Sequence, residues 1–257
     1  MEITLEKNSR HLTVFSIVKR LIIVIALVEF VVMSFFALIQ LDINHFTEAV
    51  LDAILLSLLS APFLYYWVIL PFIKDRDKAE ASIRHLALHD PLTGLANRRL
   101  LEEHAVKTLS VCSRDKSYSA LLLLDLDGFK AINDTHGHEA GDLILQNVSE
   151  SLIASLRQVD LASRLGGDEF VVLLNQIGSD ENKAIESTSI VANKLLKKIT
   201  HPVDFSGEAL TVGASIGLRI ITPKDNNVEI LLRDADEAMY LSKKAGRGCI
   251  TLFESKH

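Results

Sequence analysis

Two long runs of apolar residues dominate the first third of this 257-residue chain. Leu21–Leu41 contains a single charged residue, Glu29, and Ala53–Ile73 contains none. As a helix, each run would be roughly 30 Å long, which is the thickness of the hydrocarbon core of a bilayer. The pattern therefore predicts two transmembrane helices. A signal peptide is disfavoured for the first run, because the run is too long and no small-x-small cleavage pattern follows it.

Basic residues flank the predicted hairpin on both outer sides. The connection Asp42–Asp52 has none and is too short to fold as a sensor domain. Because Lys and Arg near membrane spans stay on the cytoplasmic side, both chain ends are predicted to be cytoplasmic, with residues 1–20 before the hairpin 21–73. The lipid bilayer is thus a predicted partner. The basic residues are Lys7, Arg10, Lys19 and Arg20 before the first run and Lys74, Arg76 and Lys78 after the second.

Three residues of the predicted spans interrupt their apolar pattern. A carboxyl group in mid-membrane is costly, so Glu29 either faces the partner helix in protonated form or takes part in sensing or helix pairing. Pro62 and Pro71 predict kinks in the second span.

Residues 74–89 are charged and are predicted to form a linker helix. Phe72, Ala79 and Leu86 recur every seven residues, with Ile83 between the last two. Two repeats fit a thin coiled-coil seam or an ordinary amphipathic helix equally well. Either helix would pass a change in pairing or rotation to the region that follows.

From residue 90 to residue 257 the pattern is that of a folded domain. A turn at Asp90–Leu95 ends the linker helix, because Pro91 disfavours helix at Asp90. Apolar spacing predicts helices at 96–111, 141–157, 182–199 and 228–245, and short apolar runs predict strands at 120–124, 161–165, 170–174, 210–221 and 250–253. Helices mixed with hairpin and crossover strands predict an α/β layered sheet with helices on its faces.

Composition narrows the functional classes. The net charge of −6 gives no basic footprint for nucleic acid. The two cysteines, Cys112 and Cys249, lie in the predicted cytoplasmic part and fit reduced packing residues rather than a disulfide or metal framework. The apolar content of 49% is high for one soluble domain, and the excess is concentrated in the two long runs.

The segment Gly166-Gly167-Asp168-Glu169-Phe170 lies between two predicted strands. Two glycines suit the tip of a β-hairpin, and adjacent acids on such a tip point into solvent or at a cation. Asp125 follows another buried strand, where a carboxylate either ends the strand or holds a metal ion over the sheet. Three further motifs accompany these acids: Phe129-Lys130-x-x-Asn133-Asp134, His136-Gly137-His138-x-x-Gly141-Asp142 and Asp90-Pro91-Leu92-Thr93-Gly94-Leu95-Ala96-Asn97-Arg98-Arg99.

In this order the motifs resemble those of the GGDEF-domain diguanylate cyclases, from about Asp90 to Phe253. The resemblance implies a sheet similar to the palm of nucleotidyl cyclases and polymerases. It also implies a homodimer that condenses two GTP molecules to cyclic di-GMP and two pyrophosphates, with Mg²⁺ or Mn²⁺ as cofactor. Together with the hairpin, it predicts an enzyme of the bacterial cytoplasmic (inner) membrane.

The resemblance also implies roles for single residues. Asp125, the Leu126 carbonyl, Asp168 and Glu169 would hold the metal ion, and Asp168 or Glu169 would deprotonate the attacking hydroxyl group. Asn133 and Asp142 match guanine-binding positions, and ionised Asp accepts from both N1–H and N2–H of guanine. Lys130, Lys243 and Arg247 match phosphate-binding positions, and His138 matches a position near the substrate. For His138, packing or hydrogen bonding is an equally good interpretation, and His136 with His138 does not make a zinc pair.

Arg157-x-x-Asp160 lies at the spacing of the family's product-inhibition site. An ordinary surface ion pair would show the same residues at the same spacing. Leu165 departs from the family, which usually carries an aromatic residue before the two glycines. The competing functional hypothesis is a catalytically silent receptor that binds GTP or cyclic di-GMP and signals by protein contact. The stimulus, the downstream receptor, the basal activity and the role of Glu29 do not follow from the residues.

Overall fold

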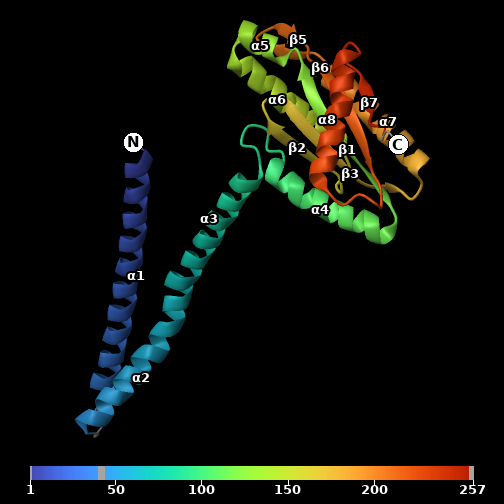
Figure 1. Cartoon of the computed structure of the whole chain (residues 1–257). Coiled ribbons are helices and arrows are strands. Elements are labelled where there is room, and N and C mark those ends of the chain that lie inside the picture. Colours follow the sequence, from blue (N-terminus) through green and yellow to red (C-terminus); the bar gives the residue numbers. More distant parts are fainter. Residues whose placement is uncertain (1, 40–43, 255–257) are drawn as a thin grey trace. The chain divides into compact units, whose positions relative to one another are not determined.

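The structure is a computed structural model that describes residues 2–39 and 44–254. The chain divides into two compact units, Met1–Arg84 and His85–His257 (Figure 1). The second unit begins a few residues before the turn Asp90–Leu95. Each unit is described separately.

The N-terminal unit consists of helices. They are α1 (Glu2–Ile39), α2 (His45–Leu64), a π-helical turn η1 (Tyr65–Ile69) and α3 (Leu70–Leu88), whose last residues belong to the second unit. The predicted connection Asp42–Asp52 is largely wrong, because α2 already begins at His45. Asn44 caps this helix by accepting a hydrogen bond from the Thr47 amide at 2.8 Å, which supplies the start signal that apolar spacing alone does not show. Leu41 and Asp42 lie outside the described residues.

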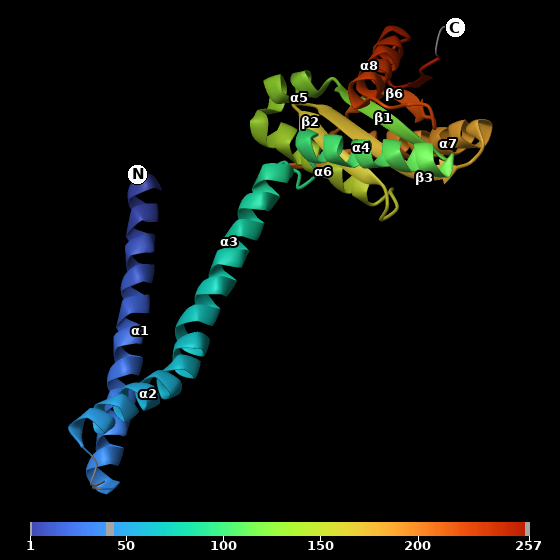
Figure 2. The ribbon, with the colours of Figure 1, turned by 60° about the horizontal axis from the view of Figure 1, so that its bottom comes forward.

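The irregular turn η1 lies between the two prolines of the second apolar run. The Leu70 amide donates to the Tyr65 carbonyl, five residues back, which is the π-helical pattern. Pro71 has no N–H to donate to the carbonyl of Trp67, and the Arg20 guanidinium of α1 donates to that carbonyl at 3.4 Å. The ribbon changes direction in this region (Figure 2).

Two stretches of these helices are long and apolar enough to cross a membrane, Ile17–Ile39 and Phe46–Lys78. Their mean hydropathies are 2.9 and 2.0, and only 17% and 6% of their most apolar windows are buried in the protein. The core helix of a soluble protein buries most of such a surface, whereas these helices expose large apolar side chains on all sides. They are therefore candidate membrane spans.

The C-terminal unit is built on a mixed five-stranded sheet of order β2-β3-β1-β6-β7. All neighbours are antiparallel except β6 and β7, which are parallel. The central strand continues past the predicted run 120–124, because Asp125 and Asp127 keep their ladder partners on β6. The strands are β1 (Tyr118–Asp127), β2 (Leu161–Gly166), β3 (Glu169–Gly178), β6 (Gly213–Ile221) and β7 (Ile250–Leu252).

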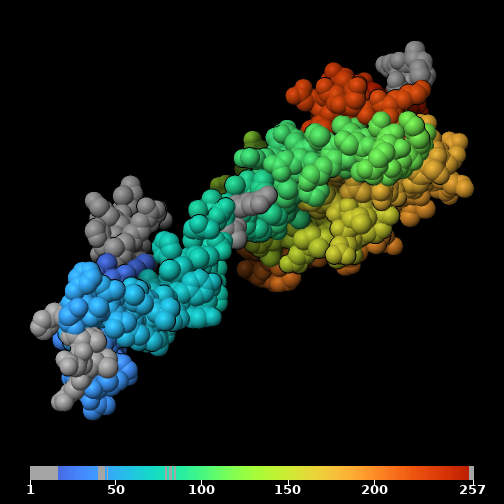
Figure 3. Space-filling view, turned by 90° about the horizontal axis from the view of Figure 1, so that it is seen from below, coloured from blue at the N-terminus to red at the C-terminus, as the bar shows by residue number. Residues whose placement is uncertain are grey.

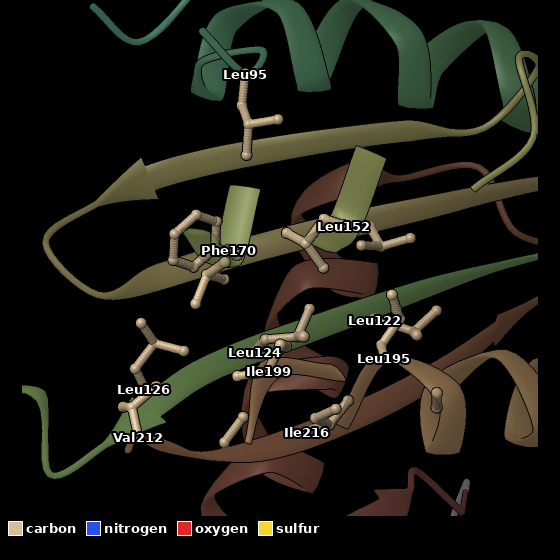
Figure 4. Packing of buried hydrophobic residues seen from close by; sticks show 14 of the residues in the cluster. Leu95, Leu122, Leu124, Leu126, Leu152, Phe170, Leu195, Ile199, Val212 and Ile216 are labelled. Atoms are coloured by element: carbon tan, nitrogen blue, oxygen red, sulfur yellow. The ribbon is translucent and has the colours of Figure 1, made fainter. Parts of the chain in front are cut away.

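Helices cover both faces of this sheet, as the sequence predicts. On one face, α6 (His138–Ile153) and α7 (Glu181–Ile199) pack on Leu122, Leu124 and Phe170 (Figure 4). On the other face, α4 (Arg98–Asp115) and α8 (Val228–Lys244) pack on Leu121, Leu123 and Leu173. Figure 3 shows α4 along the surface of the unit. Consecutive residues of β1 alternate between the two cores, as the period of a strand requires.

The sequence analysis does not predict two short elements of this unit. Helix α5 (Phe129–His136) is mostly polar, and only Phe129 of it is buried. The small hairpin of β4 (Val203–Phe205) and β5 (Glu208–Leu210) is too short for periodicity to reveal. The predicted extended segment 210–221 is therefore the end of this hairpin followed by β6.

Gly217 sets the distance between β6 and α8. A Cβ at this position would overlap the Ala235 carbonyl oxygen and the Met239 amide nitrogen. The helix backbone thus lies directly on the strand, at a distance that no other residue permits. Because Lys243 lies one turn beyond Met239, this contact positions its side chain at the end of the sheet.

Candidate active site

Acidic side chains gather at one end of the sheet, on the face that α8 covers. Asp125 pairs across the ladder with Glu169 on β3 and with Ser215 on β6. Residues directly opposite in antiparallel strands project their side chains to the same face. Asp127 follows two residues later, and the period of the strand places it on that face too.

Lys243 of α8 binds the first of these acids. Its Nζ lies 2.7 Å from the Asp125 Oδ2, and the two side chains are 31% and 14% exposed. The prediction that these two residues belong to one site rests on motifs 118 residues apart in the chain, and the structure brings them into contact. A cation and an anion that are partly shielded from solvent interact more strongly than a surface pair.

Asp168 occupies the tip of the β2–β3 hairpin, which turns through Gly166 at φ 146° and Gly167 at φ 55°. Burial raises the pKa of Asp168, and the nearby negative charge of Asp125 raises it further, against the opposing charges of Lys243 and Arg164. Two carboxylates thus repel each other here. Such a pair is stabilised by a bound cation.

The described residues contain no cluster of three or more His, Cys, Asp or Glu side chains that could hold a metal ion. The predicted set of Asp125, Asp168 and Glu169 is therefore not a closed metal cage. Mg²⁺ is usually held by one or two carboxylates together with substrate phosphates. The repelling pair of Asp125 and Asp168 fits this donor set.

Arg164 fixes the tip of the hairpin. The sequence analysis did not identify this role of Arg164. Its Nε and NH2 donate to the Gly167 carbonyl at 3.0 and 2.7 Å, and its NH1 lies 3.0 Å from Asp90 Oδ1. In the sequence, this role could have been inferred from a basic residue two positions before the glycine pair. Arg164 thereby connects the turn after α3 to the residue that precedes Asp168.

Asp90 is the other end of this connection. Burial raises its pKa, but hydrogen bonds from the Thr93 hydroxyl, the Arg164 guanidinium and the Thr93 amide outweigh burial, so the pKa lies below the ordinary 3.8. A carboxylate with a lowered pKa stabilises the folded state at every pH above its ordinary value. That stabilisation is lost as the pH falls through the lowered value.

Asp90→Asn is therefore expected to lower the free energy of unfolding at neutral pH by about 1.5–3 kcal/mol, the range for hydrogen bonds to a charged group. Urea unfolding at neutral and acid pH measures the difference, which should shrink below the folded-state pKa of Asp90. Asp115→Asn is the control, because Asp115 forms an exposed pair with Arg114 at 2.8 Å that should contribute little. A loss that does not change with pH would contradict the ionic role.

Asp127 positions the loop after α8, a function that its sequence context did not reveal. The Ser215 hydroxyl contacts both carboxylate oxygens at 2.9 and 3.0 Å, and the Gly248 amide donates to Oδ2 at 3.0 Å. The Nε of Arg247 lies 3.8 Å from Oδ1. In the sequence, the alternation of side chains along β1 could have shown that Asp127 lies on the same face of the sheet as Asp125. The exposed Arg247 side chain is thus directed from a loop anchored to the sheet.

The predicted nucleotide-binding residues lie on α5 and α6, which meet at Gly137 with φ 87°. Lys130, His138 and Asp142 are exposed, whereas Asn133 is half-buried. A Cβ on Gly141 would overlap the Asn133 side-chain amide, so the glycine makes room for it. Of the two histidines, it is His136 that has an acidic neighbour, Glu208, at 3.7 Å.

Arg157 and Asp160 form a turn beside β3. Asp160 accepts from the Arg157 Nε at 3.0 Å, from its NH2 at 2.9 Å and from the Asn175 amide at 3.0 Å. The Asp160 side chain is 2% exposed and that of Arg157 is 55% exposed. Asp160 therefore orients Arg157, and Arg157 is the partner that a ligand can reach.

Acidic and basic side chains lie together at one end of a mixed α/β sheet. Such an end is suited to an anionic ligand that binds together with a metal cation. The family model "Diguanylate cyclase, GGDEF domain" matches residues 87–249. The chain therefore belongs to the GGDEF family, as its motifs indicated.

Curated relatives and solved structures agree with this assignment. The bifunctional diguanylate cyclase/cyclic di-GMP phosphodiesterase MucR of Pseudomonas aeruginosa is 39% identical over 69% of this chain and 25% of its own length. Diguanylate cyclase TpbB of the same organism is 37% identical over 68% of this chain and 39% of its own length. The chain thus spans well under half of these relatives.

Two solved structures show the domain. A truncated TpbB comprising only the GGDEF domain is 35% identical and matches 65% of this chain and 94% of that chain with a TM-score of 0.60. The GGDEF domain of DgcB from Caulobacter crescentus, in complex with cyclic di-GMP, is 25% identical and matches 66% of this chain and 97% of that chain with a TM-score of 0.60.

Proposed function

We propose that this protein is a diguanylate cyclase. Two GTP molecules would be joined as each 3′-oxygen forms a bond to the α-phosphorus of the other nucleotide and a pyrophosphate leaves from each. The observation that carries the proposal is the convergence of Asp125 and Asp168 beside Lys243, which combines a cation-binding acid pair with a phosphate-binding charge. Family membership and relatives named diguanylate cyclases support it.

The acid pair would hold Mg²⁺, or Mn²⁺, together with the Leu126 carbonyl and Glu169. When bound, the cation stabilises the charge that develops on the attacking and leaving oxygens. A carboxylate at the hairpin tip, Asp168 or Glu169, takes the proton of the 3′-hydroxyl group.

Three cations would bind the phosphates. Lys130 and Lys243 act as point charges, and Arg247 can donate two hydrogen bonds in a fork. Release of Lys243 from Asp125 would accompany the arrival of the phosphates and the cation, because each then finds a partner of opposite charge.

Guanine selectivity would come from α5 and α6. The Asp142 carboxylate accepts from N1–H and N2–H of guanine, and adenine offers no such pair. Asn133 adds an amide that Gly141 leaves room for. His138 is exposed at the start of α6, next to these residues.

The active form would be a homodimer. One domain holds one GTP, so two domains must face each other before each 3′-hydroxyl group can reach the opposite α-phosphorus. Holding both reactants in place replaces a bimolecular encounter. The exposed apolar residues Phe72, Ile83 and Leu86 on α3 are available for pairing of the linker helices.

The two candidate spans would anchor the enzyme in the bacterial cytoplasmic membrane. Lys and Arg flank the spans and predict that the GGDEF domain is cytoplasmic. The extensive exposed apolar surface of both helices supports the bilayer as their solvent.

Product inhibition would act through Arg157. Arg157→Ala is expected to raise the cyclic di-GMP concentration for half inhibition roughly tenfold or more, because charge-assisted hydrogen bonds of an arginine are lost. Turnover of GTP at increasing added cyclic di-GMP measures the effect, with Arg233→Ala on the exposed side of α8 as the control. Equal inhibition curves for Arg157→Ala and the wild type would discard the site. The complex of the DgcB domain with cyclic di-GMP supports the proposal.

The silent receptor remains the second candidate, because some relatives carry names without a cyclase activity, such as cyclic di-GMP phosphodiesterase NbdA. Incubating the full chain in detergent with GTP and Mg²⁺ separates the two functions. The cyclase produces cyclic di-GMP and pyrophosphate, and ATP is not converted. Binding of GTP without product would establish the receptor.

A further inference from the structure

An apolar groove runs between the two candidate membrane spans. Residues between Ile23 and Val31 of α1 line one side of it, and Leu59, Phe63 and Trp67 line the other. Its volume is about 370 Å³, within the range of small-molecule sites, roughly 300–1,000 Å³. Val24 is 6% exposed, whereas Leu27 and Phe63 are 61% and 55% exposed. The groove therefore has a buried floor and walls that are open to the surroundings of the helices.

The groove has the length of one leaflet of a bilayer. Ile23 and Val31 are roughly 12 Å apart along the axis of α1, at 1.5 Å per residue. The candidate span is Ile17–Ile39, so the groove extends from near its basic end to just beyond its middle. One leaflet contributes about 15 Å to the hydrocarbon core. The groove thus fits an acyl chain that enters from the basic end of the span.

Arg20 lies at that end of the groove. It shares one face of α1 with Val24, Leu27 and Val31, because these positions recur at helical spacing. Its NH1 donates to the carbonyl of Trp67, a lining residue, at 3.4 Å. A guanidinium group has five N–H donors. Among the side chains and backbone groups that the structure describes, this carbonyl is the one partner of Arg20, so the other donors are available to an anion.

We propose that this groove binds one anionic phospholipid of the cytoplasmic leaflet, with an acyl chain between the two spans and the phosphate group on Arg20. The inference rests on the proposed membrane anchoring. Arginine can donate two hydrogen bonds to a phosphate group, and basic sites between spans on the cytoplasmic side recognise anionic head groups. A zwitterionic head group carries a cation beside its phosphate, which weakens its attraction to Arg20.

The bound lipid would connect α1 to the irregular turn of the second span. Trp67 belongs to η1, and α3 begins directly after this turn at Leu70. A lipid that contacts both Arg20 and Trp67 would stabilise the packing of α1 on η1, from which the linker helix continues. The lipid composition of the membrane would thereby affect the start of the linker helix.

Trp67 is the only tryptophan of the chain, so its fluorescence reports on this groove. The test is a titration of the full chain in detergent with phosphatidylglycerol or phosphatidylcholine, each brominated on the acyl chains, because bromine quenches indole fluorescence on contact. Phosphatidylglycerol is expected to reach half-maximal quenching at a roughly fivefold lower lipid fraction or less, the effect of one basic residue. Arg20→Ala should abolish this difference. Arg76→Ala, at an exposed position of α3, should retain it.

A second variant tests the groove itself and leaves Arg20 intact. Val28→Phe places a larger side chain in the groove and should also reduce the preference for phosphatidylglycerol. Unchanged quenching by phosphatidylcholine in both variants would show that Trp67 remains among acyl chains.

The contradicting results are distinguishable. Equal quenching by the two lipids in the wild type, or an undiminished preference in Arg20→Ala, would overturn the lipid site and leave the membrane anchoring intact. Absence of quenching by either lipid at every protein concentration would contradict the anchoring and the site together. Shielding of Trp67 that disappears on dilution would assign the groove to a second copy of the chain and overturn the proposal.

Discussion

Asp125→Asn is expected to lower the rate of cyclic di-GMP formation by roughly 10²–10⁴-fold, the range for loss of a positioned catalytic group. The amide has the shape of the carboxylate but no charge, so it cannot attract a divalent cation or hold the Lys243 ammonium at 2.7 Å. It also removes one of the two charges that repel each other at the site. The loss should appear in kcat at saturating GTP and at a Mg²⁺ concentration that saturates the wild type.

Asp236→Asn is the matched control, because Asp236 is an exposed acid on α8. It should keep wild-type turnover. Raising the Mg²⁺ or Mn²⁺ concentration should recover part of the lost rate in Asp125→Asn but change nothing in the control. Retention of more than about a tenth of the wild-type rate by Asp125→Asn would remove this residue from the site.

Gly217→Ala is expected to destabilise the GGDEF domain by about 3 kcal/mol or more, at or beyond the upper end of overpacking effects. The added methyl group would overlap backbone atoms of Ala235 and Met239, which no change of side-chain rotamer can relieve. Either β6 or α8 must move. A shift of α8 would separate Lys243 from Asp125, so turnover should fall even where the protein remains folded.

Chemical denaturation of the variant and the wild type measures this effect. Gly213→Ala on the same strand provides a graded comparison, because its Cβ would lie 3.2 Å from the Asp127 Cβ, which is a milder contact. A smaller loss is expected for Gly213→Ala. Equal stability of Gly217→Ala and the wild type would show that α8 is not seated through this glycine.

The apolar pattern predicts the main elements of the GGDEF domain because their periodicity reflects the core that they build. Leu121 and Leu122 pack into different cores, as alternation along a strand requires. The same reasoning does not predict helix α5, because a short polar helix buries little apolar surface. The ends of β1 escape it too, since Asp125 and Asp127 are polar residues that stay in the sheet by backbone pairing.

Motifs locate the candidate site, but they do not show which residues support it. Arg164 and Asp127 act through contacts with Gly167 and Gly248 that depend on the folded arrangement of distant segments. The importance of Gly217 likewise comes from the approach of α8, which spacing along the chain does not encode. Asp160 has a motif signature, yet only its burial shows that it orients Arg157.

The most direct test of the account is formation of cyclic di-GMP from GTP and Mg²⁺ by the purified full chain and by its Asp168→Ala, Glu169→Ala double variant. The account predicts steady product formation by the wild type and none above background by the double variant, with both proteins folded. Equal product formation by the two proteins would contradict it, since the hairpin-tip acids would then take no part in the reaction.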